Sequence, residues 1–148
     1  MFARFSKTLS SFLFVILFDI IYSVLGILVI DHTAKRTVSA VIAIALLCGL
    51  FFAGYMLGAK FFGAAKKKVV SIVIMPMILT LLMFGLGIIA VPVVGMLMQY
   101  PAVVLMESLG IDKLLADDSV VFYIIAILYH LLCCLSLLIG SYHKKHAQ

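Results

Sequence analysis

The chain has 148 residues, of which 66% are hydrophobic and 11% are charged, and its formal net charge is +5. Soluble domains contain about 45–50% apolar and about 25% charged residues. A soluble fold of this length cannot hide so much apolar surface, because its surface-to-volume ratio is too high. The composition therefore excludes an ordinary soluble domain and predicts a protein whose solvent is lipid.

Four long apolar runs follow one another along the chain. Each is close to the roughly 20 residues that a helix needs to cross about 30 Å of hydrocarbon. Helices are expected rather than strands, since the runs do not alternate and lipid requires backbone groups to be bonded internally. We expect an all-α integral membrane protein, one domain over residues 1–148, folded as a four-transmembrane-helix bundle. The spans are predicted at about 10–30, 38–59, 69–91 and 119–141.

The first span contains the only acidic residue predicted to lie within the membrane, Asp19 in "LFDIIYS". An uncompensated charge at the bilayer centre costs about 2.5–3.5 kcal/mol on insertion scales. At 100° per residue, Asp19 shares one helix face with Tyr22, Ser23 and Gly26. The opposite face is purely aliphatic and suits lipid. Asp19 is therefore predicted to point into the bundle.

The second span contains "GYMLG", a G-x-x-x-G motif formed by Gly54 and Gly58. Two glycines four residues apart let helices approach backbone to backbone. The motif predicts close helix packing, either within the chain or between two copies. We expect alanine to be tolerated at both positions and isoleucine to be rejected, because a branched side chain prevents close approach.

The third span contains Pro76, and Pro92 follows at its end. A proline inside a helix frees the carbonyl four residues earlier and kinks the helix. Both prolines are predicted hinge positions. Prolines are also frequent in spanning helices without any such role.

One substantial connection, at about residues 95–118, is predicted to lie outside. Pro101 can start a short helix and Gly110 can end one. The mixture of apolar and charged residues between them predicts a short amphipathic segment in the outer loop, on the membrane surface or capping the bundle. An ordinary apolar loop is the alternative.

The fourth span has His130 near its centre, at the depth that Asp19 has in the first span. We predict that the two side chains meet at mid-membrane and share hydrogen bonds with Tyr22, Ser23 or Tyr123. These five residues form the predicted intramembrane polar site. Two interpretations stay open: a proton- or cation-sensitive functional site, and a neutral hydrogen-bonded brace between helices.

Basic residues predict the orientation. Alternate ends of the spans carry eight cations, Arg4, Lys7, Lys60, Lys66, Lys67, Lys68, Lys144 and Lys145, whereas the opposite ends carry Lys35, Arg36 and Lys113. Positively charged loops stay in the cytoplasm. Both termini are therefore predicted to be cytoplasmic, in a multi-pass protein of a bacterial plasma (inner) membrane.

The sequence contains no Walker A loop, no H-E-x-x-H and no G-x-S-x-G, so an enzyme is not expected. No catalytic residue, cofactor or metal site is predicted, and no nucleic-acid motif is present.

We expect a small non-enzymatic transport-type component, either an oligomeric carrier or an accessory subunit of a membrane complex. A structural or regulatory membrane protein is the alternative, and an intramembrane enzyme is third. The expected partners are membrane lipids and either further copies of the chain or a larger membrane protein.

Overall fold

The computed structural model describes residues 2–32, 36–63, 67–89, 92–111 and 119–143, and within these ranges the secondary structure is helical without strands. Its elements are α1 (Phe2–His32), α2 (Arg36–Phe62), the π-helical turn η1 (Val70–Ile74), α3 (Met75–Ile89), α4 (Pro92–Leu109) and α6 (Ser119–His143). In the part of the chain that the structure describes, three helices contain stretches long and apolar enough to cross a membrane: Lys7–Leu28, Thr37–Phe62 and Val120–His143. A shorter apolar helix covers Val70–Gly85.

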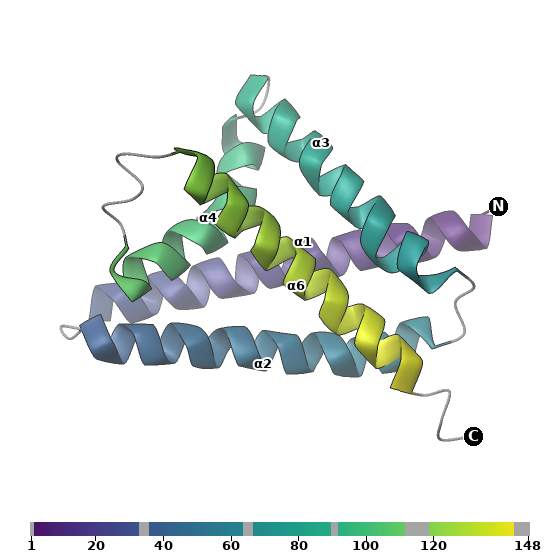
Figure 1. Cartoon of the computed structure of the whole chain (residues 1–148), viewed down its shortest axis with the longest axis horizontal. Helices are drawn as coiled ribbons and strands as arrows, with labels where there is room; N and C mark the ends of the chain where they lie inside the picture. The colour runs from purple at the N-terminus through teal and green to yellow at the C-terminus, as the bar shows by residue number, and fades with distance from the viewer. Residues whose placement is uncertain (1, 33–35, 64–66, 90–91, 112–118, 144–148) are drawn as a thin grey trace.

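The helices are arranged so that the N-terminal end of α1, the beginning of η1 and the C-terminal end of α6 lie at one end of the bundle (Figure 1). α1 and α2 meet at the opposite end. α2 and α6 pack on each other in the same general direction, since Gly54 faces Ser136 and Gly58 faces Leu137. α1 runs against both of them, and α4 fills the space beside α1, α2, α3 and α6.

Each face of α1 has the environment that its residues require. Asp19, Tyr22, Ser23 and Gly26 are buried, whereas the aliphatic residues Leu13, Leu17, Val24 and Leu28 on the opposite side are exposed. In a membrane these exposed side chains contact lipid. α6 has the same division, with His130, Cys134 and Ser141 buried and Ile124, Leu128, Leu135 and Ile139 exposed. The inward direction of Asp19 thus agrees with its prediction from helical periodicity.

Pro76 is the second residue of α3, which follows the π-helical turn, and it is fully buried. Because proline has no N–H, the carbonyl of Ile72, four residues earlier, loses its usual α-helical donor. The Ser11 hydroxyl of α1 donates a hydrogen bond to this carbonyl oxygen at 3.1 Å. The Met75 N–H bonds instead to the Val70 carbonyl, in the wider π pattern. The helix irregularity at Pro76 is thus stabilised by a side chain from another helix, while hinge motion there stays a prediction.

The segment after α3 differs from the short outer helix expected from sequence. α4 begins at Pro92, the first helical position that proline favours, and continues through Pro101. Proline keeps a helical φ, and in apolar surroundings an interrupted helix would leave further backbone groups unbonded, so the helix continues. The expectation that Pro101 would start the helix is therefore wrong.

The end of α4 is the one that the sequence indicates. Gly110 has φ 75°, a left-handed conformation in which glycine has no steric penalty. Its N–H donates to the Glu107 carbonyl at 3.1 Å, and the Ile111 N–H donates to the Met106 carbonyl at 3.0 Å. These two bonds make a Schellman motif, and Ile111 packs with Met106 in the same apolar cluster.

α4 is packed into the bundle along much of its described length. Ala102, Val104, Met106 and Ser108 are buried, although Glu107 and Leu109 are exposed. At the contact with α1, a Cβ atom added at Gly26 would overlap the side chain of Val104. Glycine at position 26 therefore allows α4 to approach α1 closely, and α4 contributes to the core of the molecule.

Lys68 has a structural contact in addition to its contribution to the charge pattern. It is buried, its Nζ donates a hydrogen bond to the Ser141 carbonyl oxygen, and it lies 4.6 Å from the centroid of the Tyr142 ring. Carbonyl groups in the last turn of a helix have no intrahelical donor, and a cation is favourable there. Lys68 thus joins the beginning of the η1–α3 segment to the end of α6.

Candidate functional site: a buried Asp–His pair

Asp19 of α1 and His130 of α6 meet inside the bundle. Asp19 Oδ2 lies 3.1 Å from His130 Nε2, and both side chains are 0% exposed. The other ring nitrogen, Nδ1, lies 2.6 Å from the carbonyl oxygen of Ala126, one turn earlier in α6. The two ionisable residues predicted to pair from their depth are therefore within hydrogen-bonding distance.

The partners of the imidazole ring determine where its hydrogens can be. A carbonyl oxygen only accepts hydrogen bonds, so the bond to Ala126 requires a hydrogen on Nδ1. A hydrogen bond between Nε2 and Oδ2 then requires one proton between these two atoms. The proton is on His130 in an aspartate–imidazolium pair or on Asp19 in a neutral pair. In either form the pair as a whole has no net charge, which suits a low-dielectric interior.

Aromatic side chains contact the His130 ring. The Phe84 ring of α3 meets the His130 ring edge to face, with centroids 5.5 Å apart. The neighbouring Tyr129 hydroxyl donates to the Phe18 carbonyl of α1 at 3.2 Å. A second cross-helix hydrogen bond therefore lies one residue away from the Asp19–His130 contact on both helices.

The three other predicted members of the polar site do not bond to Asp19 or His130 in the interactions seen among the described residues. Tyr22 is buried and donates to the Ala43 carbonyl of α2 at 3.3 Å. Ser23 is buried, and its Oγ has no hydrogen-bond partner in the described part of the chain. Tyr123 is half-buried and packs with Phe122 in an apolar cluster. Tyr22 and Ser23 lie on the buried face of α1 that periodicity predicts, but the Tyr22 hydroxyl bonds to α2 and not to Asp19.

One oxygen of the Asp19 carboxylate is not used in a hydrogen bond within the described part of the chain. This oxygen is Oδ1, and it is buried. The Ser23 hydroxyl, four residues later on the same helix face, is in the same situation, as is Thr80 Oγ1 of α3. The site therefore has unused hydrogen-bonding capacity inside the protein.

Ser11, Phe84, Ala126 and Tyr129 were not part of the predicted site. Tyr129 directly precedes His130 in the sequence, and Ala126 lies one turn before it. No signal in the sequence relates Ser11 to Ile72 or Phe84 to His130, because the acceptor at Ile72 is a backbone carbonyl and Phe84 is one of many apolar residues in its span.

The two glycines of the G-x-x-x-G motif lie at the contact between α2 and α6. A Cβ at Gly54 would meet the Ser136 side chain, and a Cβ at Gly58 would overlap the Leu137 carbonyl. Gly140 of α6 approaches the Tyr55 backbone of α2 in the same way. The motif is thus used within the chain. The geometry at Gly58 argues against the expectation that alanine is tolerated there, because the obstructing atoms are backbone atoms that cannot rotate away.

Among the described residues there is no group of three or more histidine, cysteine, aspartate or glutamate side chains able to hold a metal ion. No protein-family model, curated protein or solved structure matches this chain.

Proposed function

We propose that this chain is a non-enzymatic membrane protein with a structural or regulatory role, in which the Asp19–His130 pair braces α1 against α6. The observation that carries the proposal is the complete burial of both side chains, which are 0% exposed. A site that exchanges a substrate with water requires an opening, whereas a brace does not. The parallel bond from Tyr129 to the Phe18 carbonyl supports the same role.

Replacement of Asp19 by asparagine and by leucine tests the brace. Asparagine cannot ionise, but its amide can donate to His130 Nε2, so Asp19→Asn is expected to unfold at the parent's denaturant concentration. Leucine removes the hydrogen bond, and Asp19→Leu is expected to lose about 1–2 kcal/mol of unfolding free energy, the range of hydrogen bonds between membrane helices. Denaturant titration in mixed micelles measures both variants. Equal stability of Asp19→Leu and the parent would exclude a brace.

A transport-type component, working as an oligomeric carrier or as an accessory subunit, is the second candidate. It is favoured by the single proton between Asp19 and His130 and by the unpartnered Asp19 Oδ1, which together could accept and release a proton or bind a cation.

Reconstitution into liposomes containing a pH-sensitive dye separates the candidates. A brace predicts no protein-dependent proton flux. A flux that Asp19→Asn abolishes while stability is retained would favour the carrier.

We further propose that the η1–α3 segment is a fourth span, and that both termini lie in the cytoplasm of a bacterial inner membrane. The support is the common end of the bundle shared by the beginnings of α1 and η1 and the C-terminal end of α6 (Figure 1). Lys7 and Lys67 also belong to segments that begin at this end. These basic residues suit the cytoplasmic side.

Cysteine labelling in intact cells tests this orientation. A cysteine at Asp112, which lies outside the described residues, is expected to react with a membrane-impermeant thiol reagent. A cysteine at the exposed position Lys67 is expected to stay unlabelled until the cells are opened. The unsubstituted protein, with its natural Cys48, Cys133 and Cys134, serves as the background control. Labelling of position 67 but not of position 112 in intact cells would reverse the assignment.

A further inference from the structure

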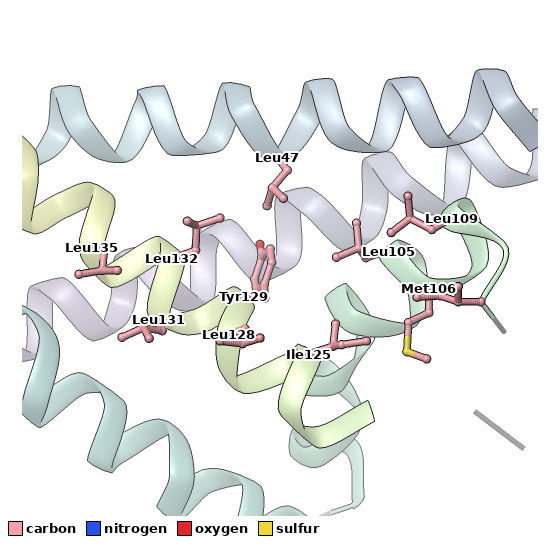
Figure 2. Close-up of a pocket in the computed structure, with 11 residues that line it drawn as sticks. Leu47, Leu105, Met106, Leu109, Ile125, Leu128, Tyr129, Leu131, Leu132 and Leu135 are labelled. Atoms are coloured by element: carbon pink, nitrogen blue, oxygen red, sulfur yellow. The ribbon is translucent and has the colours of Figure 1, made fainter. Parts of the chain in front are cut away.

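A groove of about 450 Å³ lies between α2, α4 and α6. Its walls are formed by aliphatic side chains, among them Leu47 of α2, Leu105 and Leu109 of α4, and Leu128, Leu132 and Leu135 of α6 (Figure 2). Tyr129 also lines it, but the hydroxyl of this residue is bonded to the Phe18 carbonyl. An occupant finds no unused polar partner in this lining and must itself be apolar along the groove.

The dimensions of the groove distinguish between apolar occupants. The lining on α6 extends from Ile125 to Leu135, and the ten helical steps between them span about 15 Å at 1.5 Å per step. A volume of 450 Å³ over this length gives a cross-section of about 30 Å², roughly 6 Å across. A helix is about 10–12 Å across and does not fit. A single hydrocarbon chain fits, because carbon atoms in contact are only about 3.5–4.0 Å apart.

The groove is continuous with the surface that the spanning helices present to lipid. Leu109, Leu128 and Leu135 line it and are also among the exposed residues of the molecule. A lipid tail can therefore enter sideways from the bilayer without crossing a polar barrier. From these dimensions and this continuity we infer that the groove between α2, α4 and α6 binds one acyl chain of a membrane lipid. This inference does not depend on the role of the Asp19–His130 pair.

The test uses the full chain in phosphatidylcholine–phosphatidylglycerol vesicles that contain a phospholipid with a photoactivatable diazirine at the middle of one tail. After irradiation, mass spectrometry of peptides is expected to find adducts concentrated on groove residues such as Leu105 and Leu132. Adducts spread evenly over the lipid-facing residues, including Ile44 and Phe52 on the outer side of α2, would overturn the inference, since they indicate only general lipid contact.

A pair of matched variants tests whether the lipid acyl chain lies within the groove. Leu132→Trp adds bulk inside the groove and is expected to reduce the groove adducts to the level of the general lipid surface. Ile139→Trp makes a comparable change on the same helix at an exposed position outside the lining, and is expected to leave the adducts unchanged. Unchanged adducts in Leu132→Trp would contradict the inference. A change of oligomeric size in Leu132→Trp would also contradict it, because the groove would then be filled by a second copy. If Leu132→Trp does not fold, the adduct positions in the parent decide the question.

Discussion

Gly58→Ala is expected to be strongly destabilising, although it adds only one methyl group. The added Cβ would overlap the Leu137 carbonyl oxygen and would lie 2.8 Å from its carbon and 2.9 Å from Leu137 Cα. Overpacking a well-packed interior costs about 1–3 kcal/mol and occasionally more. Because the obstacle is backbone, relief requires α6 to move away from α2. We expect a loss of about 3 kcal/mol in unfolding free energy, measured by denaturant titration in mixed micelles.

Gly49→Ala is the matched control for Gly58→Ala. Gly49 lies nine residues earlier on the same helix and is exposed, and a Cβ there would meet no atom within 4 Å. Alanine is favoured over glycine in helices by about 1 kcal/mol, so Gly49→Ala is expected to be as stable as the parent or slightly more stable. Equal effects at the two positions would mean that the α2–α6 contact is not as close as described. Gly140→Ala, where the obstacle is the Tyr55 carbonyl, is expected to resemble Gly58→Ala.

Gly26→Ala is expected to push α4 away from α1, with a cost of about 1–3 kcal/mol. The new Cβ would overlap one methyl group of Val104 and would lie 3.3 Å from the other. Valine is restricted to few χ1 rotamers, so it cannot easily turn aside. Val104→Ala removes both methyl groups, and the double variant should therefore be more stable than the sum of the single effects indicates. A coupling free energy of at least about 1 kcal/mol is expected from a double-mutant cycle.

Gly85→Ala provides the reference for the Gly26–Val104 cycle. A Cβ at Gly85 would meet no atom within 4 Å, so its combination with Val104→Ala is expected to be additive within about 0.5 kcal/mol. If the changes in unfolding free energy of Gly26→Ala and Val104→Ala were additive as well, α4 would not pack against α1 at these residues. The outer segment would then lie elsewhere, as in the surface helix expected from the sequence. The cycle thus decides between two positions of α4 without a structure of the variants.

These glycine effects are related to the Asp19–His130 brace through the geometry of α6. His130 reaches Asp19 at 3.1 Å, and Gly140, ten residues later on α6, touches the backbone of α2. A displacement of α6 from α2 therefore changes the position of His130 relative to α1. Gly58→Ala and Asp19→Leu are accordingly expected to be partly coupled, whereas Gly49→Ala and Asp19→Leu are not.

The sequence by itself determined the membrane class, the helical character, the inward direction of Asp19 and the end of α4 at Gly110. Each of these depends on local chemistry: run length, helical period, the cost of a charge in lipid, and the left-handed conformation that glycine permits. The pairing of Asp19 with His130 could also be predicted from the sequence, because matched depth on two antiparallel helices leaves few partners for either residue.

Only the tertiary structure decided how α4 sits and which groups complete the polar interactions. A run of residues such as Pro92–Leu109 is equally compatible with a surface helix and with a packed one, and the difference is the complementarity of Gly26 and Val104 across two helices. The Ser11 bond to the Ile72 carbonyl likewise depends on the separation of helices joined through other elements. In lipid, apolar side chains gain little from leaving their solvent for one another, so close packing and individual hydrogen bonds determine helix positions. Those contacts depend on distances in space that helical periodicity along one segment does not contain.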